Sequence, residues 1–229
     1  MSESKRLVWD QTGEKLYETG VRQGVLYVMG ADGKYGAGEA WNGLTAVNES
    51  PSGAEPTALY ANDTKYVELM SNEEFGGTIE AYTYPDGFAA CNGETAVVAG
   101  VFATQQARST FGLCYRTAIG NDIVGTDYGY KLHIVYGAKA TPSEKNNATI
   151  NDKPEAATMS WEFSTTPVSV EGFKPTAHVY IDSTKLDEQG KAKLKTLEDL
   201  LYGTDAVEAA LPDLATVFST MGYTPSSAA

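Results

Sequence analysis

The chain has 229 residues, 42% of them hydrophobic, and a formal net charge of −13 from 30 acidic and 17 basic residues. This composition allows one large domain with a buried core and excludes a disordered chain. The acidic balance argues against a nucleic-acid-binding surface, which needs a basic patch, and against docking on an anionic membrane. Acidity would serve solubility and repulsion of DNA equally, and the composition does not separate the two.

The N-terminal residues 1–15 contain no apolar segment of the kind that begins a secretory signal. The longest apolar run, residues 96–103, is far shorter than the roughly 20 residues that a membrane span needs. We therefore expect a chain that is cytosolic when it is made. Cys91 and Cys114 are not in a CxxC motif, so they are expected to be reduced, small core residues.

The first half of the chain has the pattern of short strands separated by turns. Residues 24–29 predict a strand, 30–38 a glycine-rich loop, and 39–48 a strand with apolar residues on both faces. Residues 50–56 predict a turn, and residues 57–61 and 65–70 predict strands around Asn62 and Asp63. Residues 78–84 alternate cleanly, and Pro85 then ends that strand.

Further strands are predicted at residues 110–119, 128–140, 158–165 and 176–183. From Leu186 to Leu201 the leucines then follow helical spacing, which predicts an amphipathic helix with Thr184 as its N-cap and Gly203 just after its end. Residues 205–210 and 213–221 predict two shorter helices.

About ten short strands followed by helices are typical of an α+β fold that is mainly β. We expect a β-sandwich or barrel with a flanking amphipathic α-helix and short C-terminal helices. The chain is expected to form a single domain over residues 1–229, with a β-rich core (1–183), a helical part (184–222) and a tail (223–229).

No motif in the chain carries recognisable chemistry. There is no P-loop, no dinucleotide fingerprint and no zinc-binding cysteine or histidine pattern. His133 and His178, the only two histidines, both fall in the middle of strands and are expected either to face solvent or to be satisfied in the interior, without a catalytic role. The pairs Glu73-Glu74 and Glu198-Asp199 are expected on solvated turn and helix faces. No catalytic, cofactor-binding or metal-binding residue is predicted.

Five segments, taken together, carry a resemblance to a known family: residues 41–91, 111–122, 127–145, 154–168 and 197–212. They resemble, in this order, the major tail proteins, or tail tube proteins, of long-tailed, non-contractile phages of Gram-positive bacteria. The match covers most of the chain and rests on the sum of the segments, since no single one is a chemical signature.

The resemblance implies a virion structural protein. Subunits of that family form hexameric rings that stack into a hollow tube, which is assembled in the bacterial cytoplasm and carries DNA into the host. The implied partners are further copies of the chain, the tape measure protein in the lumen, and the tail terminator and distal tail or baseplate proteins at the ends. Double-stranded DNA would pass without specific binding, and no membrane partner or cofactor is implied.

One segment is a candidate for contact between rings. Residues 48–57 are rich in turn-forming residues, and such a loop can order against a neighbouring subunit. The expected contact residues are Asn48, Ser50, Pro51, Gly53, Glu55, Pro56 and Thr57. Deleting residues 50–55 should then prevent tubes while the monomer still folds.

Two rival interpretations remain open. One is an all-β carbohydrate- or surface-binding module that stacks its ligand on Trp41 and Trp161, with Tyr82 and Tyr84 as further candidates, although strand aromatics more often fill a core. The other is the tube protein of a contractile injection or secretion system, which shares the ring but binds a sheath.

Overall fold

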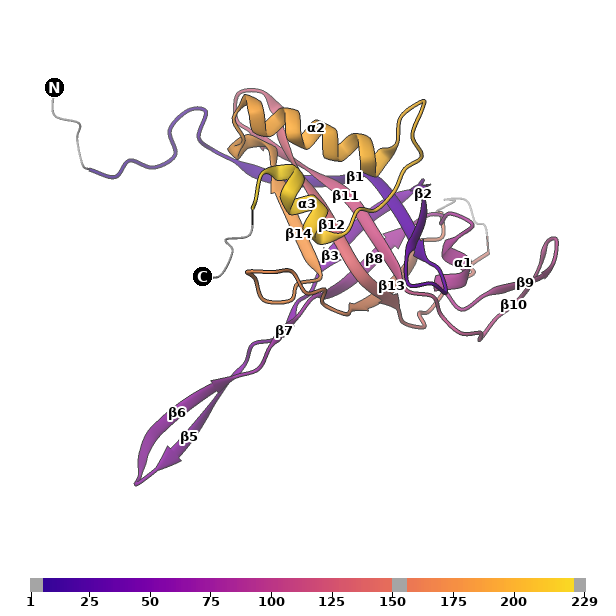
Figure 1. Ribbon diagram of the computed structural model, residues 1–229, viewed down its shortest axis with the longest axis horizontal. Coiled ribbons are helices and arrows are strands. Elements are labelled where there is room, and N and C mark those ends of the chain that lie inside the picture. The colour runs from indigo at the N-terminus through magenta and orange to yellow at the C-terminus, as the bar shows by residue number, and fades with distance from the viewer. Residues whose placement is uncertain (1–5, 150–155, 225–229) are drawn as a thin grey trace.

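The computed structural model describes residues 6–149 and 156–224; within the predicted tail, residues 225–229 lie outside this range. Strands are the most abundant regular element of the described chain (Figure 1). The strands are β1 (Tyr17–Met29), β2 (Tyr35–Trp41), β3 (Leu44–Glu49), β4 (Ser52–Gly53), β5 (Pro56–Ala61), β6 (Thr64–Met70), β7 (Glu73–Glu74), β8 (Gly76–Ala81), β9 (Thr95–Val98), β10 (Val101–Ala103), β11 (Phe111–Asn121), β12 (Gly125–Ala140), β13 (Met159–Thr165) and β14 (His178–Asp182). The helices are α1 (Phe88–Cys91), the 3-10 turn η1 (Ser183–Lys185), α2 (Glu188–Tyr202) and α3 (Leu214–Met221). The predicted α+β, mainly β fold class is confirmed.

Eight strands form one antiparallel sheet in the order β2-β1-β11-β12-β13-β8-β3, and β14 also pairs with β12. The sheet divides along β12, because residues 131–135 pair with β14 whereas residues 138–140 pair with β13. Gly137 lies between these two stretches with a φ of +62°, and a Cβ there would lie 2.5 Å from the Thr166 carbonyl oxygen. Glycine is therefore required at the point where the strand changes partner.

The division produces two hydrophobic cores on opposite faces of β1, β11 and β12. On one face, Leu26, Leu113 and Val135 pack against Trp161 and Phe163 of the second sheet layer. On the other face, Tyr27 and Ile134 lie under the helices, whose buried residues include Leu194, Leu197, Leu201, Leu214 and Val217. Figure 1 shows α2 and α3 together over this face. The body of the protein therefore has three layers, with its central strands buried on both sides.

Helix α2 is fixed to the sheet by a buried ion pair. Glu198 accepts a hydrogen bond from Tyr130 (2.6 Å) and lies 2.5 Å from the Arg116 guanidinium, which also stacks over the rings of Tyr130 and Tyr202. The expectation that Glu198 lies on a solvated helix face is therefore wrong. Its helical position was correct, but the sequence could not show that it faces an arginine on the sheet.

Several predicted boundaries are corrected by the structure. The N-cap of α2 is Asp187, which accepts a hydrogen bond from Gly190, and not Thr184, which lies in η1. Gly203 follows α2 as predicted, with a φ of +75°. Residues 205–210 form no helix, although α3 matches the prediction for 213–221.

The predicted strand at residues 39–48 is in fact two strands. The turn at Asn42 and Gly43 sends β2 to pair with β1 and β3 to pair with β8. The preceding loop is also shorter than predicted, because β2 already begins at Tyr35. The apolar residues on both faces of segment 39–48 thus reflect a chain that crosses between the two sheet layers, and not one strand covered on both sides.

Candidate assembly surfaces and the root of the arm

A long β-hairpin, residues 50–75, extends away from the body, and we call it the arm. Its base is the short pair β4–β7 and its outer part is the pair β5–β6, which turns at Asn62 and Asp63 (Figure 1). Every residue of β6 is exposed, and so is every residue of β5 except Ala58, which is half-buried. The body therefore gives the outer arm almost no cover.

The arm carries large apolar side chains on both of its faces. The pairing of Leu59 with Val67 and of Thr57 with Leu69 places Leu59, Val67 and Leu69 on one face. Met70, which pairs with Pro56, lies on the other face, and Tyr66 lies at the register shift between the Leu59 and Tyr60 pairs. Tyr66 is 77% exposed and Leu69 is 54% exposed. A two-stranded ribbon cannot bury either face by itself, so both faces are available to other molecules.

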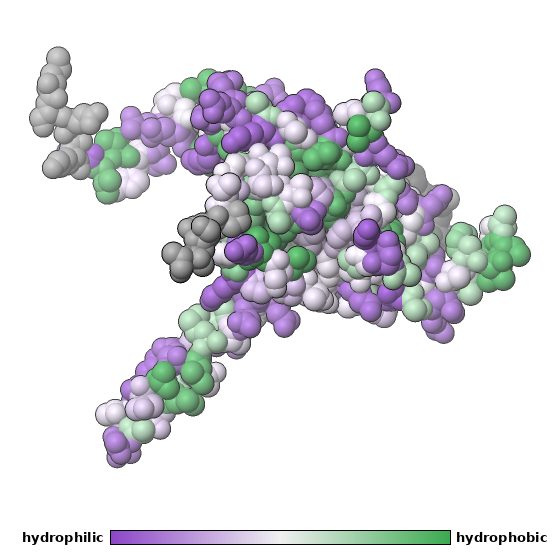
Figure 2. Space-filling model, in the orientation of Figure 1, coloured by the Kyte–Doolittle hydropathy of each residue, from purple (hydrophilic) through white to green (hydrophobic). Residues whose placement is uncertain are grey.

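Two further extensions expose apolar residues elsewhere on the molecule. The hairpin β9–β10 exposes Val97, Val98, Val101 and Phe102, and it projects from a different part of the body than the arm does (Figure 1). The hydropathy surface shows apolar side chains on both hairpins (Figure 2). Near the N-terminus, Leu7, Val8 and Trp9 form a third exposed apolar segment.

The predicted contact residues fall at the start of the arm and just before it. Asn48 lies in β3, where its side chain donates a hydrogen bond to Glu80 (3.1 Å). Ser50 and Pro51 begin the arm, Gly53 is in β4, Glu55 lies between strands, and Pro56 and Thr57 begin β5. The structure thus assigns most of these residues to an exposed projection. The sequence hypothesis missed the returning strand β6, which carries most of the large apolar residues, although both strands were recognised separately.

The two ends of the arm meet at a pair of histidines, an arrangement that we call the arm root. Glu49 precedes the arm, and its Oε1 lies 3.2 Å from His133 Nδ1 and 4.0 Å from His178 Nε2. The two ring nitrogens are themselves 3.2 Å apart. Phe75, where the chain returns, stacks on His178 with ring centroids 4.3 Å apart. The same two imidazoles therefore contact both ends of the arm.

Neighbouring groups on β11 complete the arm root. Tyr115 stacks on His133 at 4.6 Å, with the rings almost parallel, and donates a hydrogen bond of 2.7 Å to Glu49. Thr117 Oγ1 lies 3.0 Å from His133 Nε2. Of the two positions expected for the histidines, the satisfied interior one is consistent with these contacts, but the sequence reading missed that they lie together.

Strand parity explains why the histidines meet. His133 lies opposite Tyr115 on one side and opposite Tyr180 on the other, so His178, two residues before Tyr180, is on the same face. This signal is available only once β14 is known to pair with β12. The contribution of Glu49 depends on the second sheet layer and has no signal in the sequence.

The environment of the arm root shifts two pKa values. A hydrogen bond with His133, together with one from Tyr115 and the nearby imidazoles, outweighs desolvation and lowers the pKa of Glu49 to about 2. Burial lowers the pKa of His178 to about 4, although the Glu49 charge opposes this shift. At neutral pH the arm root therefore contains an ionised carboxylate beside a neutral His178.

The residues proposed for ligand stacking lie mostly inside the protein. Trp41 and Trp161 are 4% and 3% exposed, and they contact each other and Phe88 in the core. Tyr82 is exposed, whereas Tyr84 is half-buried. The two tryptophans therefore offer no surface on which a sugar can stack.

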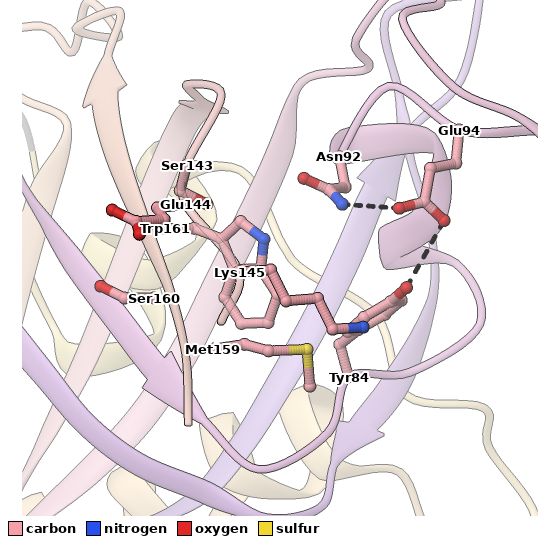
Figure 3. Close-up of a pocket in the computed structure, with 9 residues that line it drawn as sticks. All are labelled: Tyr84, Asn92, Glu94, Ser143, Glu144, Lys145, Met159, Ser160 and Trp161. Atoms are coloured by element: carbon pink, nitrogen blue, oxygen red, sulfur yellow. Dashed lines mark hydrogen bonds between the residues drawn. The ribbon is translucent and has the colours of Figure 1, made fainter. Parts of the chain in front are cut away.

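A small cavity of about 60 Å³ lies beside Trp161 (Figure 3). Its polar lining includes Glu94, which accepts hydrogen bonds from Asn92 (2.7 Å) and Tyr84 (3.4 Å), and Lys145. Ligand pockets usually have volumes of about 300–1,000 Å³, so this cavity holds a few water molecules at most.

Cys91 and Cys114 are fully buried and free, as predicted, and burial raises the pKa of both thiols to about 12. Within the described ranges, no helix is long and apolar enough to cross a membrane. No protein-family model matches the chain, and no curated protein is significantly similar to it.

Proposed function

We propose that the protein is the tail tube subunit of a long-tailed, non-contractile phage. Copies of the chain close into hexameric rings, and the rings stack into a hollow tube through which DNA passes into the host. The observation that carries this proposal is the arm, which exposes large apolar side chains on both faces. The resemblance of most of the chain to tail tube proteins supports the same function.

The arm is suited to lie between two neighbours. Burying one leucine-sized side chain completely stabilises a complex by about 1.5–3 kcal/mol. Leu59, Val67 and Leu69 on one face, Met70 on the other and the exposed Tyr66 therefore leave apolar surface on both sides of the arm that a neighbouring copy can bury. A ring neighbour and a subunit of the next ring are the natural occupants of the two faces.

The placement of the projections supports an open-ended assembly. The arm and the β9–β10 hairpin leave the body in different directions (Figure 1), so each meets a different surface of a neighbouring copy. Contacts between unlike surfaces generate rings where the rotation closes and filaments where it does not. The length of such a stack must be set from outside, which is the role we assign to a tape measure protein, with terminator and distal tail proteins at the ends.

The charge of the chain suits a conduit for DNA. With 30 acidic residues against 17 basic ones, the chain repels the phosphate backbone on balance. A basic lumen would hold DNA through many phosphate contacts and slow its passage.

The rival binding module is less well supported, because its two tryptophans are in the core. The tube of a contractile injection or secretion system shares the same ring, and we favour the non-contractile form because the resemblance is to that family.

The test is negative-stain electron microscopy and sedimentation velocity of the tag-free chain over a concentration series. We expect rings or hollow tubes to appear as concentration rises, with or without added tape measure protein. A chain that stays monomeric in both conditions contradicts the proposal. Saturable quenching of tryptophan fluorescence by a glycan would instead favour the binding module.

A further inference from the structure

We propose that Glu49, His133 and His178 bind a divalent transition-metal ion, with Zn²⁺ as the ion that suits them best. Their facing ligand atoms are separated by 3.2 Å, 3.2 Å and 4.0 Å. All three lie within 4.8 Å of one another and come from three different strands. This inference goes beyond the tube function and does not depend on it.

The separations match what such an ion requires. In a tetrahedral zinc site with metal–ligand distances of about 2.0–2.1 Å, neighbouring ligand atoms lie about 3.3–3.4 Å apart. Two of the three separations at the arm root are already close to this value, and a small movement of the more exposed Glu49 shortens the third. Two imidazoles and one carboxylate favour zinc, cobalt or nickel over calcium and magnesium, which prefer oxygen ligands alone.

The surrounding residues orient the ligands as they do in known metal sites. To coordinate through Nδ1, His133 must carry its proton on Nε2, where Thr117 Oγ1 lies 3.0 Å away and can accept it. Tyr115 donates a hydrogen bond to Glu49 and also stacks on His133, while Phe75 stacks on His178.

One coordination position remains for another ligand. The side chains of His133 and His178 are largely buried, whereas that of Glu49 is 36% exposed, so the open side of the site faces solvent next to Glu49. A water molecule completes the tetrahedron there. The bound ion would connect Glu49, at the end of β3, to β12 and β14. It would therefore hold the chain against the sheet at the point where the arm begins.

The chain offers an unusually clean test, because its only two histidines are both in the proposed site. Tag-free protein, treated with chelator and kept at monomer concentration, is titrated with ZnCl₂ by calorimetry and with CoCl₂ by visible absorption. The variants are His178→Gln and Glu49→Gln, with Glu74→Gln as the matched control. Glu74 is an exposed carboxylate in the arm base, so its substitution makes the same change in charge outside the site.

We expect the wild type and Glu74→Gln to bind one Zn²⁺ per chain and to give the Co²⁺ absorption of a low-coordinate site. Glu49→Gln should weaken binding at least about tenfold, and His178→Gln should remove it. Circular dichroism checks that each variant is folded. In the wild type itself, Zn²⁺ should also shift the imidazole proton signals of both histidines in NMR spectra.

Absence of Zn²⁺ binding to the folded wild type, or binding that His178→Gln leaves unchanged, would overturn the proposal. Unperturbed histidine signals at saturating Zn²⁺ would do the same. None of these results bears on tube formation, which is measured separately and at higher concentration.

Discussion

The central strands of the body and the strands of the arm have a similar sequence pattern but opposite surroundings. Residues 132–138 of β12 are all buried, between the helices on one face and the second sheet layer on the other. Every residue of β6 is exposed, although β6 also carries apolar side chains on both faces. The same pattern therefore occurs on a strand that the monomer covers and on one that it leaves exposed, so the pattern alone does not identify what covers a strand.

The largest expected effect is the loss of stability when a core leucine is shortened, and the same change in the arm gives a direct comparison. Leu113→Ala removes a fully buried side chain from the core and should lower the free energy of unfolding of the monomer by about 2–5 kcal/mol. Leu69→Ala, the matched change in the arm, should lower it by less than about 0.5 kcal/mol. Urea denaturation of dilute protein measures both. Similar losses for the two variants would mean that the arm is covered within the monomer.

A second prediction concerns the ion pair that attaches α2 to the sheet of the body. Glu198→Ala removes a buried carboxylate and leaves the half-buried Arg116 without its ion-pair partner, and it should cost about 3–5 kcal/mol of monomer stability. Asp199→Ala, on the same helix, removes only the more exposed ion pair with Lys195 and should cost under about 1 kcal/mol. Thermal and urea unfolding compare the two, and equal costs would show that the Arg116 pair does not hold the helix in place.

The arm root should make the stability of the metal-free protein depend on pH. His178 has a folded pKa of about 4, below its ordinary 6.5, so the unfolded chain binds more protons between these values. Stability is therefore fully present above pH 6.5 and falls on acidification, by about 2 kcal/mol at pH 5 from this residue. Glu49, with a folded pKa of about 2, adds a further loss in the same direction below about pH 4.5.

Urea denaturation at pH 5, 6 and 8, in the presence of chelator, measures this dependence. His178→Gln should flatten the curve between pH 5 and pH 6.5, whereas the surface change Glu74→Gln should leave its slope unaltered. A wild-type curve that is flat from pH 8 to pH 5 would contradict the burial of His178.

The smallest effect on the monomer is expected at the exposed aromatic residues of the outer arm. The double variant Tyr60→Ser/Tyr66→Ser changes side chains that are 72% and 77% exposed, so the free energy of unfolding should change by less than about 0.5 kcal/mol per site. Its assembly should nevertheless shift to higher protein concentration in sedimentation velocity runs. A variant that assembles like the wild type would exclude Tyr60 and Tyr66 from the interface.

Most of the strands were predictable from the sequence, because alternation identifies a strand wherever one face is buried. Trp161 and Phe163 were correctly placed on one face of β13. Helix α2 followed from leucine spacing and from Gly203 at its end, although its N-cap is Asp187 and not Thr184, and α3 matches the short helix predicted at residues 213–221. The break at Gly43 was missed, because apolar residues on both faces of 39–48 suggested one continuous strand.

The arm root was not predictable, for a different physical reason. Glu49, His133 and His178 come from three strands whose pairing depends on the whole sheet, and no local pattern encodes their convergence. The burial of Glu198 is a similar case, since it depends on an arginine far away in sequence. Local patterns identify elements, whereas sites form where elements meet.

The most direct test of the central claim is to remove the outer arm and keep its base. Residues 55–71 are deleted, and the changes Ala54→Asn and Asn72→Gly supply a two-residue turn between the paired residues Gly53 and Glu73. This variant is cleaner than deletion of residues 50–55, which removes β4 and leaves β7 without its partner. Electron microscopy then compares it with the wild type at equal concentration. Our account predicts a folded monomer that forms no tubes, whereas wild-type tubes from the armless chain would contradict it.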